Sequence, residues 1–405
     1  MDALTTPSTW QRVRLGGVGK PCMCKRVMKH QTTQYGEIPF YKIGTFGNTA
    51  DAFISKKLFL EYKTKYSFPK KGDILISASG TIGRAVIYDG KPAYFQDSNI
   101  VWIDNDETLV KNDFLFYAYS HVKWNTEHTT ILRLYNDNFR NTLIPLPPLN
   151  EQIAIANILS DVDRYLYSLD ALILKKESVK KALSFELLSQ RKRLKGFNQA
   201  WQRVRLGDMT TSFTKQTGFD YSDFIKPTLI KEQLPNYIPF IQNKDFSGHY
   251  INYKTDYFIP NEIAIRFPQI LLNEKCLLIS ISGAIGNVAV FNHSQDAFIG
   301  GAIAVLKFKE KKSLDFVMHF LMSASGQKLL LNSVKSSSHK NLTIADLRDL
   351  LIPLPPLNEQ IAIANILSDL DHEITSLKNK KRQFENIKKA LNHDLMSAKI
   401  RVLKK

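Results

Sequence analysis

The segment LIPLPPLNEQIAIANILSD at residues 143–161 recurs without change at residues 351–369. The segment WQRVRLG at residues 10–16 recurs in the same way at residues 201–207. The two offsets are 208 and 191 residues, so the sequence between the repeats is 17 residues longer in the second copy (208 − 191 = 17). The chain is therefore a duplicated module of about 200 residues, in which two near-identical frames enclose two different inserts.

The two inserts resemble each other only weakly, and both are predicted to be rich in β-strands. Short runs of β-branched and aromatic residues bounded by Gly or Asp predict strands in both copies. These runs are residues 74–80, 85–88 and 99–103 in the first copy, and 277–283, 288–291 and 302–308 in the second. Residues 112–122 and 314–331 have apolar residues at three- and four-residue spacing, which predicts a helix in each.

Each insert ends at a proline cluster, residues 145–148 and 353–356, which is followed by a long amphipathic segment. Asn150 is an N-cap candidate there, and we predict a helix from Asn150 to Lys195 with Gly196 as its C-terminal cap. The second copy repeats this pattern. A heptad series of apolar residues predicts the core between the two helices. The series consists of Val162, Leu166, Leu169, Ile173, Leu183, Leu187, Leu370, Ile374, Leu377, Phe384, Leu391 and Leu395.

Two helices with one apolar stripe each bury those stripes most simply against each other. We therefore predict an α+β fold, in which two β-rich domains are joined by two long antiparallel helices, a coiled-coil spacer with pseudo-twofold symmetry. The predicted boundaries are 1–149 for the first domain, 150–197 for the central helix, 198–357 for the second domain and 358–405 for the C-terminal helix.

The charge of the chain points to a polyanionic partner. The formal net charge is +17, which favours nucleic acid first and an anionic membrane surface second. No apolar run approaches the ~18 residues of a membrane span, and the first ten residues lack the features of a secretory signal. We expect a cytoplasmic protein without a membrane partner. Cys22, Cys24 and Cys276 lack the spacing of a zinc site, so we expect free thiols and no metal.

No catalytic motif is evident in the sequence. Residues 16–21, GGVGKP, resemble a phosphate-binding loop, but Arg14 and Pro21 stand where that loop needs Gly and Ser or Thr. With the duplication, this absence favours a binding scaffold with no catalytic residue. Two alternatives stay open at this stage: a self-contained nuclease or methyltransferase, and a coiled-coil adaptor for protein or RNA.

The repeated segments resemble the specificity (S) subunits of type I restriction–modification systems. The resemblance rests on the doubled IPLPPL-x-EQ word at Ile144–Asp163 and Ile352–Asp371, and on the segment Gly72–Arg84 with its weaker echo at Leu277–Asn287. It implies that each insert is a target-recognition domain for one part of an asymmetric bipartite DNA target. It also implies that the helices dock two modification (methyltransferase) subunits and, through them, restriction (translocase/nuclease) subunits. S-adenosylmethionine, ATP and Mg²⁺ would then belong to the partner subunits alone.

Candidate DNA contacts lie in the inserts. The turn Ser79-Gly80-Thr81 with Arg84 can offer backbone N–H groups, a hydroxyl and a cation to phosphate. The alternative is a tight turn beside a solvated arginine. Polar and basic side chains elsewhere can contact phosphates or base edges. The full set is Lys42, Ser79, Gly80, Thr81, Arg84, Arg133, Tyr135, Asn136, Arg140, Asn243, Lys244, Ser282, Gly283, Asn287, His339, Lys340 and Asn341.

The second copy departs from the first in this turn, because Ala284 and Asn287 replace Thr81 and Arg84. A phosphate contact there is accordingly less strongly indicated. Six residues of the repeated word are predicted either to cap the helices or to form a surface shared by two identical partners. They are Asn150, Glu151, Gln152, Asn358, Glu359 and Gln360.

Overall fold

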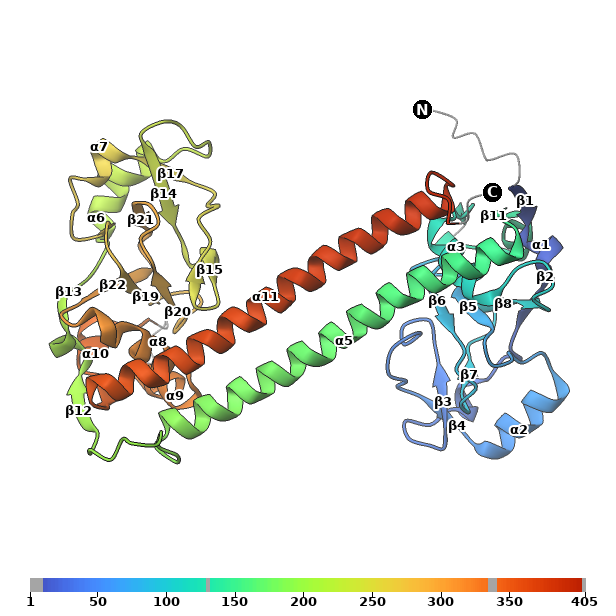
Figure 1. Cartoon of the computed structure of the whole chain (residues 1–405), viewed down its shortest axis with the longest axis horizontal. Helices are drawn as coiled ribbons and strands as arrows, with labels where there is room; N and C mark the ends of the chain where they lie inside the picture. The colour runs from blue at the N-terminus through green and yellow to red at the C-terminus, as the bar shows by residue number, and fades with distance from the viewer. Residues whose placement is uncertain (1–9, 129–131, 334–340, 403–405) are drawn as a thin grey trace. The chain divides into compact units, whose positions relative to one another are not determined.

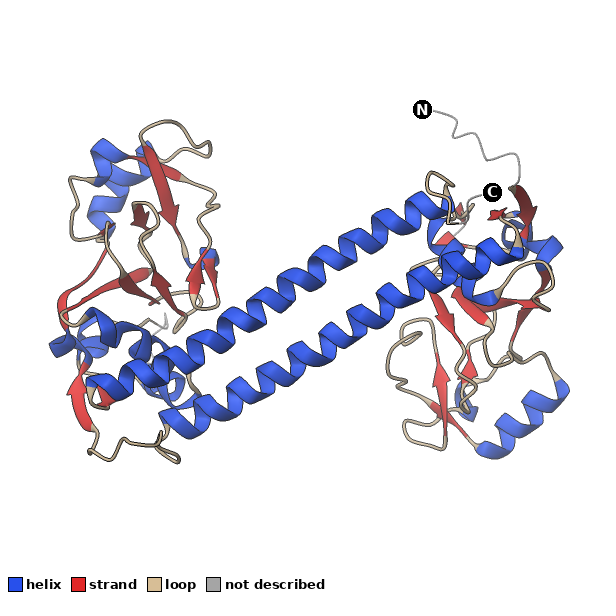
Figure 2. Cartoon of the chain, viewed as in Figure 1, coloured by secondary structure: helices blue, strands red, loops and turns tan. Residues whose placement is uncertain are grey.

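The computed structural model describes residues 10–128, 132–333 and 341–402. The chain divides into two compact units, Met1–Ala171 with Asn379–Lys405, and Leu172–Lys378. In each unit, strands and short helices form a globular part from which segments of both long helices extend (Figures 1 and 2). The two units are described separately below.

The described residues of the globular part of the first unit form a four-stranded sheet, a three-stranded sheet and two two-stranded sheets. Its elements are β1 (Gln11–Arg14), α1 (Leu15–Val18), β2 (Gly19–Met23), β3 (Ile38–Tyr41), β4 (Phe53–Ile54), α2 (Lys56–Lys65), β5 (Ile74–Ser77), β6 (Ala85–Ile87), β7 (Tyr94–Phe95), β8 (Ile100–Asn105), α3 (Asn112–His121), β9 (Glu127–His128), β10 (Leu132–Arg133), α4 (Asn136–Asn141) and β11 (Leu143–Leu146). The four-stranded sheet has the order β2-β8-β5-β6 and the three-stranded sheet β4-β3-β7, in which β3 and β7 are parallel. The two-stranded sheets are β9–β10 and β1–β11, and the second of these joins the two ends of the insert.

The second unit repeats this topology and extends it. Its elements are β12 (Gln202–Arg205), β13 (Thr210–Lys215), α6 (Gly218–Asp220), β14 (Tyr237–Ile241), β15 (Phe246–Ser247), β16 (Tyr250–Ile251), β17 (Phe258–Pro260), α7 (Asn261–Ala264), β18 (Leu271–Leu272), β19 (Cys276–Ser280), β20 (Val288–Phe291), β21 (Ala297–Ile299), β22 (Ile303–Phe308), α8 (Leu314–Met322), α9 (Ala324–Asn332), α10 (Ile344–Arg348) and β23 (Leu351–Leu354). The order β13-β22-β19-β20 repeats β2-β8-β5-β6, and β17-β14-β21 repeats β4-β3-β7. Strands β15, β16 and β18 extend the two sheets, so the drifted inserts share one topology and the longer copy adds strands to it.

The predicted strands are confirmed as β5, β6, β8, β19, β20 and β22. The predicted helix over residues 314–331 is instead broken into α8 and α9 at Ser323. Ser323 has an extended backbone, and its hydroxyl accepts a hydrogen bond from the amide of Gly326 at 3.2 Å. This side-chain cap starts a new helix, which the apolar spacing alone does not reveal.

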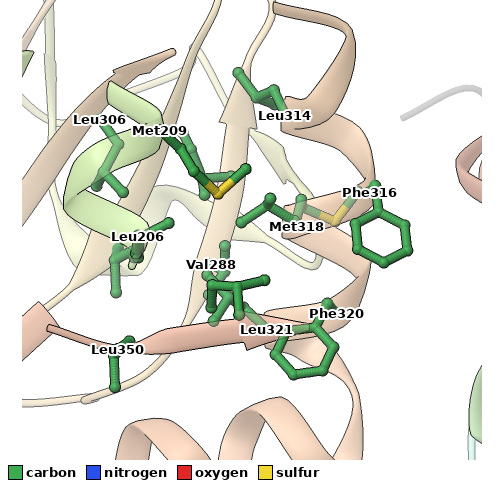
Figure 3. Packing of buried hydrophobic residues seen from close by; sticks show 14 of the residues in the cluster. Leu206, Met209, Val288, Leu306, Leu314, Phe316, Met318, Phe320, Leu321 and Leu350 are labelled. Atoms are coloured by element: carbon green, nitrogen blue, oxygen red, sulfur yellow. The ribbon is translucent and has the colours of Figure 1, made fainter. Parts of the chain in front are cut away.

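The core of the second unit lies between the larger sheet and α8. Figure 3 shows Val288 and Leu306 of the sheet together with Met318 and Leu321 of the helix in this cluster. The same cluster includes Leu187 near the end of α5 (Leu188 is its last residue) and residues near the start of α11, the two long helices described next. In the first unit, α3 and the sheet form the matching cluster with Ile155 and Leu395. The ends of the long helices are therefore part of the globular cores.

The two long helices, α5 (Leu149–Leu188) and α11 (Leu357–Met396), run antiparallel within each unit. In the first unit Lys388 pairs with Asp163 at 2.5 Å and Lys381 with Asp170 at 2.7 Å. In the second unit Lys176 pairs with Glu373 at 2.8 Å. Antiparallel pairing of the helices is thus confirmed on the contacts within each unit.

The residues predicted to form the helix–helix core lie in two different environments. Leu169, Ile173 and Ile374 are buried along the helices, while Val162, Leu166, Leu370, Leu377 and Phe384 are half-buried, and the ring of Phe384 lies 4.6 Å from that of Tyr165. Leu183, Leu187, Leu391 and Leu395 contact the globular clusters instead. The heptad pattern predicted the buried face of the helices correctly, but the residues at its terminal positions pack against the cores of the globular parts.

Both long helices end earlier than predicted. The helix expected to reach Lys195 stops at Leu188, and Gln190 adopts a left-handed backbone with φ of 61°. Ala398, 208 residues later, does the same with φ of 56° beyond the end of α11. Gly196 has a positive φ but lies outside the helix, so it does not cap it. Arg193 and Arg401 lie beyond these helix ends.

A buried glutamate at the start of each long helix binds the arginine that follows the other helix. In the first unit Glu151 accepts hydrogen bonds from Trp10 Nε1 at 3.0 Å and from Arg401 Nε at 2.6 Å. In the second unit Glu359 accepts them from Trp201 Nε1 at 3.2 Å and from Arg193 Nε and Nη2 at 2.7 and 2.6 Å. We call each set a glutamate clamp. Each clamp ties the first strand of the frame, the start of one helix and the end of the other together.

The glutamate clamp is expected to stabilise the folded chain. Glu359 is fully inaccessible, so Glu359→Ala should lower the free energy of unfolding by about 2–4 kcal/mol, because Arg193 and Trp201 lose a buried acceptor. The control is Glu186→Ala, which removes a partly exposed pair with Lys192 and should cost under about 1 kcal/mol. Urea unfolding of both variants measures the difference; equal effects would contradict the structural role of the clamp.

Candidate nucleic-acid interface

The predicted contact turn of the first domain is built around Ser77, the last residue of β5. The Ser77 hydroxyl donates to the carbonyl of Thr81 and accepts from the amide of Arg84 at 2.9 Å. Gly80 and Gly83 both have positive φ, 65° and 83°. A Cβ on Gly83 would lie 2.1 Å from Trp124 Nε1, so this turn requires glycine there. The glycines have the structural role named as the alternative, and the turn exposes Thr81 and Arg84.

The second domain builds the same turn with different exposed side chains. Ser280 takes the place of Ser77: its hydroxyl donates to the carbonyl of Ala284 and accepts from the amide of Asn287 at 3.0 Å. Gly283 and Gly286 have φ of 71° and 87°. Ala284 and Asn287 are exposed where the first domain exposes a hydroxyl and a guanidinium. The same backbone turn thus exposes different side chains in the two domains.

Two other predicted contacts, Arg133 and Lys42, lie beside the turn of the first domain. Ser79 donates to Asn99 Oδ1 at 2.7 Å and its backbone bridges to Arg133. Arg133 in turn donates to the carbonyl of Ser98 at 2.9 Å. The loop that contains Lys42 approaches from the other side, because a Cβ on Gly80 would lie 3.7 Å from the neighbouring Ile43. Lys42, the turn and Arg133 therefore form one candidate contact surface.

The loop before β8 was not predicted as part of this surface. Ser98 has a φ of 52°, a left-handed backbone that is uncommon outside glycine. The sequence Asp97-Ser98-Asn99 is typical of a turn, so it carried a signal that could have been found. Strained residues held by their surroundings often lie at binding sites. Here the Arg133 guanidinium helps to hold the strained residue.

In the second domain, Asn243 joins the corresponding turn. Its Nδ2 donates to the carbonyl of Ser282 at 2.7 Å, and Asn243 and Lys244 line a hollow of about 500 Å³. Asn341 is exposed, and the amide of the next residue, Leu342, donates to the carbonyl of Ile281 at 3.0 Å. Asn243, Lys244, Ser282, Gly283, Asn287 and Asn341 thus gather around one turn. The predicted contacts His339 and Lys340 lie outside the described residues.

The cations of these surfaces differ in how they are paired. Lys42 binds Asp51 at 2.8 Å, and Lys244 binds Asp256. The hydrogen bond to Asp256 raises the pKa of Lys244, so this lysine stays charged at neutral pH. Among the described residues, Arg84 is exposed and has no carboxylate partner. Arg84 is therefore the best placed cation for a phosphate.

The remaining predicted contacts of the first domain lie on a different feature. Tyr135 is exposed at the start of α4, while Asn136 and Arg140 of α4 line a hollow of about 560 Å³ with Gly16, Gly19 and Lys20. The glycine-rich segment of residues 16–21, which lacks the residues of a phosphate-binding loop, thus lies beside α4. This helix carries the cation of Arg140. The amide of Leu134, next to Tyr135, donates to the carbonyl of Ala78 at 2.8 Å, whereas Asn136 and Arg140 line the hollow.

The residues considered for partner binding are mostly internal. Glu151 and Glu359 are the clamp acceptors. Gln152 Nε2 donates to the carbonyl of Pro147 at 2.8 Å, and Gln360 Nε2 donates to that of Pro355 at 2.7 Å. All four are at most 3% exposed, so they cannot contact a partner in this conformation and instead hold the helix start against the proline cluster. Asn150 and Asn358 are exposed, and a partner contact for them stays a prediction.

No helix in the described parts of the chain is long and apolar enough to cross a membrane.

The model of the type I restriction modification DNA specificity domain matches residues 7–177 and again residues 198–386. The chain belongs to this family. It is a non-catalytic specificity subunit that recognises DNA sequence, and each half of the chain carries one copy of the domain.

Two curated relatives differ in how much of the chain they match. A putative type I restriction enzyme specificity subunit of Haemophilus influenzae is 64% identical over 148 residues, which are 36% of this chain and 38% of the relative. The MjaVIII specificity subunit of Methanocaldococcus jannaschii is 27% identical over 99% of this chain and 95% of its own length.

Solved structures confirm the fold. The type I restriction–modification S subunit of M. genitalium superposes with a TM-score of 0.63 at 17% identity, covering 97% of both chains. A structure from a study of the assembly of the type I restriction–modification system gives a TM-score of 0.52 at 18% identity, covering 97% of this chain and 98% of the other. The predicted α+β architecture with two recognition domains is therefore confirmed.

The guanidinium of Arg84, which has no carboxylate partner within the described ranges, leads to a prediction about DNA binding. Arg84→Ala should weaken duplex binding and reduce the slope of log affinity against log salt by about one, because one fewer counterion is released. The control is Lys65→Ala on α2, which removes a cation already paired with Glu61 at 3.1 Å and should leave the slope unchanged. Fluorescence anisotropy across a salt series measures both. An unchanged slope for Arg84→Ala would contradict a phosphate contact.

Proposed function

We propose that this subunit recognises an asymmetric bipartite DNA target, with one recognition domain for each half-site. The main support is the repeated turn, in which the same backbone exposes Thr81 and Arg84 in one domain and Ala284 and Asn287 in the other. Equal scaffolds with unequal side chains suit two DNA sequences that differ from each other.

The stretch between the half-sites is proposed to be a gap without base contacts, whose length depends on the helical spacer. Helix α5 is continuous over 40 residues, which is about 60 Å at 1.5 Å per residue. The ion pairs between α5 and α11 and the two glutamate clamps support a stiff connection. A stiff spacer would fix half-site separation, as dimer geometry does in other DNA-binding proteins.

The proposed partners are double-stranded DNA, two modification (methyltransferase) subunits and, through them, restriction subunits. The relatives' names as restriction-enzyme specificity subunits support this proposal. Asn150 and Asn358 are exposed in identical sequence surroundings, which suits the docking of two copies of one partner. S-adenosylmethionine, ATP and Mg²⁺ would act on those partner subunits, and the complex would work in the cytoplasm, where the chromosomal DNA lies.

The modular proposal predicts the result of a segment exchange. Replacing residues 17–142 with the matching segment of a relative that has another target should change one half of the methylated motif only. The exchange leaves Trp10, Glu151 and Arg401 in place, so the first clamp is retained. Single-molecule sequencing of methyladenine in host DNA, with the modification subunits present, identifies the motif.

The matched control is an exchange of residues 208–350, which should change the other half-site and leave the first intact. A change of both halves in either chimaera would overturn the assignment of one domain to each half-site. A change of the gap alone would assign these segments to spacing and not to recognition.

A further inference from the structure

A cluster of two histidines, one aspartate and one lysine lies inside the second unit. His249 precedes β16, His319 is on α8, Asp371 on α11 and Lys180 on α5. His249 Nε2 lies 3.2 Å from Asp371 Oδ2 and 3.0 Å from Lys180 Nζ, and Lys180 also binds Asp371. One donor atom from each of His249, His319 and Asp371 lies within 4.8 Å of the others. Four separate elements thus converge on one point.

The corresponding point in the first unit lacks both imidazoles. There Lys388 binds Asp163 at 2.5 Å, and these residues lie 208 positions from Lys180 and Asp371. Tyr117 of α3 donates its hydroxyl to Asp163 Oδ2 at 2.9 Å. His319 of α8 occupies the position that corresponds to Tyr117, three residues after an Asp-Phe pair in both copies. His249 lies between β15 and β16, and the described sheets of the first unit have no counterpart of these strands. The duplicated frame supplies the lysine and the aspartate, and the second insert adds the two histidines.

We propose that His249, His319 and Asp371 form a binding site for a divalent transition-metal ion of the zinc type. Two imidazole nitrogens and one carboxylate oxygen are a donor set that suits Zn²⁺ with one position left for water. Bonds of about 2.0–2.1 Å place tetrahedral donors roughly 3.4 Å apart, so the cluster must close by about an ångström.

The surroundings of the two histidines support metal binding. The Ser368 hydroxyl lies 2.9 Å from His319 Nε2 and orients the ring. His249 Nδ1 is buried without a hydrogen-bond partner among the described residues.

Lys180 is the internal competitor of the metal ion. Its ammonium lies between Asp371 and His249, where it supplies the positive charge that the carboxylate needs. A bound metal ion would replace it, and the lysine side chain, which is 23% exposed, would turn toward solvent. Removal of Lys180 should therefore tighten metal binding, whereas a merely structural polar network would lose stability without gaining affinity for a metal.

A metal ion here would connect the β15–β16 hairpin and α8 of the second recognition domain to α11. It would fix this domain on its segment of the spacer, a connection that the first unit makes with Tyr117, Asp163 and Lys388. Sequence spacing does not reveal the site, because 70 residues separate the first histidine from the second and 52 separate the second from Asp371.

The test is calorimetric titration of the chelator-treated full chain with Zn²⁺. We expect saturable binding of one ion per chain, weakened at least tenfold in His249→Gln and in His319→Tyr, which installs the residue of the first unit. Lys180→Met should bind Zn²⁺ several-fold more tightly. The controls are Lys388→Met, at the corresponding point of the first unit, and His293→Ala, which removes an exposed histidine paired with Asp296 at 2.8 Å. Neither control should change the affinity.

Thermal melts without metal identify variants that fail to fold. If both histidine variants do so, Zn²⁺ K-edge absorption of the wild-type chain decides, and two imidazoles with one carboxylate are expected. The absence of saturable binding, unchanged affinity in folded histidine variants, or loss of binding in His293→Ala would each overturn the site.

Discussion

Each unit depends on a carboxylate taken out of water at the first turn of a long helix. Glu151 and Glu359 are 2% and 0% exposed, and a buried carboxylate is tolerated only when hydrogen bonds and an opposite charge compensate for the lost hydration. Trp10 with Arg401, and Trp201 with Arg193, supply that compensation. Because these partners come from a first strand and from beyond the end of the other long helix, satisfying one carboxylate brings three distant segments together.

The need to compensate each buried carboxylate explains why the identical segments occur at these positions of the sequence. The first repeated segment contains Trp10 or Trp201, whose indole donates the hydrogen bond. The second repeated segment contains Glu151 or Glu359, whose carboxylate accepts it. Between them, the inserts share only the sheet order and the serine-centred turn. A frame that closes through its own clamp allows the exposed side chains of the insert to vary without loss of the fold, which is what a DNA-recognition module requires.

Much of the fold could be predicted from the sequence, and the exceptions have local causes. The heptad series found the buried helix face, but it could not show that Leu187 and Leu395 pack into the domains, since helix–helix and helix–domain burial produce the same pattern. The helix ends at Leu188 and Met396 were not predicted, because neither Gln190 nor Ala398, the left-handed residues that follow, is a glycine. Their identity in both copies suggested a partner surface for Glu151 and Gln152, although both are internal.

The sequence predicted the turn and two contacts beside it, Lys42 and Arg133, but not the whole candidate contact surface. The glycine turn at Ser79–Arg84 was found because its echo is visible at Ser282–Asn287. Ser98 was missed because its left-handed backbone is imposed by its surroundings, including Arg133. The cluster of His249, His319 and Asp371 was missed because only the fold brings these residues together.

We propose that the paired helices hold the two DNA-recognition modules at a fixed separation. The direct test is a paired insertion of seven residues, one heptad, after Ser168 in α5 and after Lys381 in α11, where Asp170 and Lys381 face each other. The methyladenine motif of the host is then sequenced. We predict that both half-sites stay unchanged while the gap lengthens by roughly one to three base pairs, because seven residues add about 10 Å of helix. Methylation with an unchanged gap, or with altered half-sites, would contradict the account.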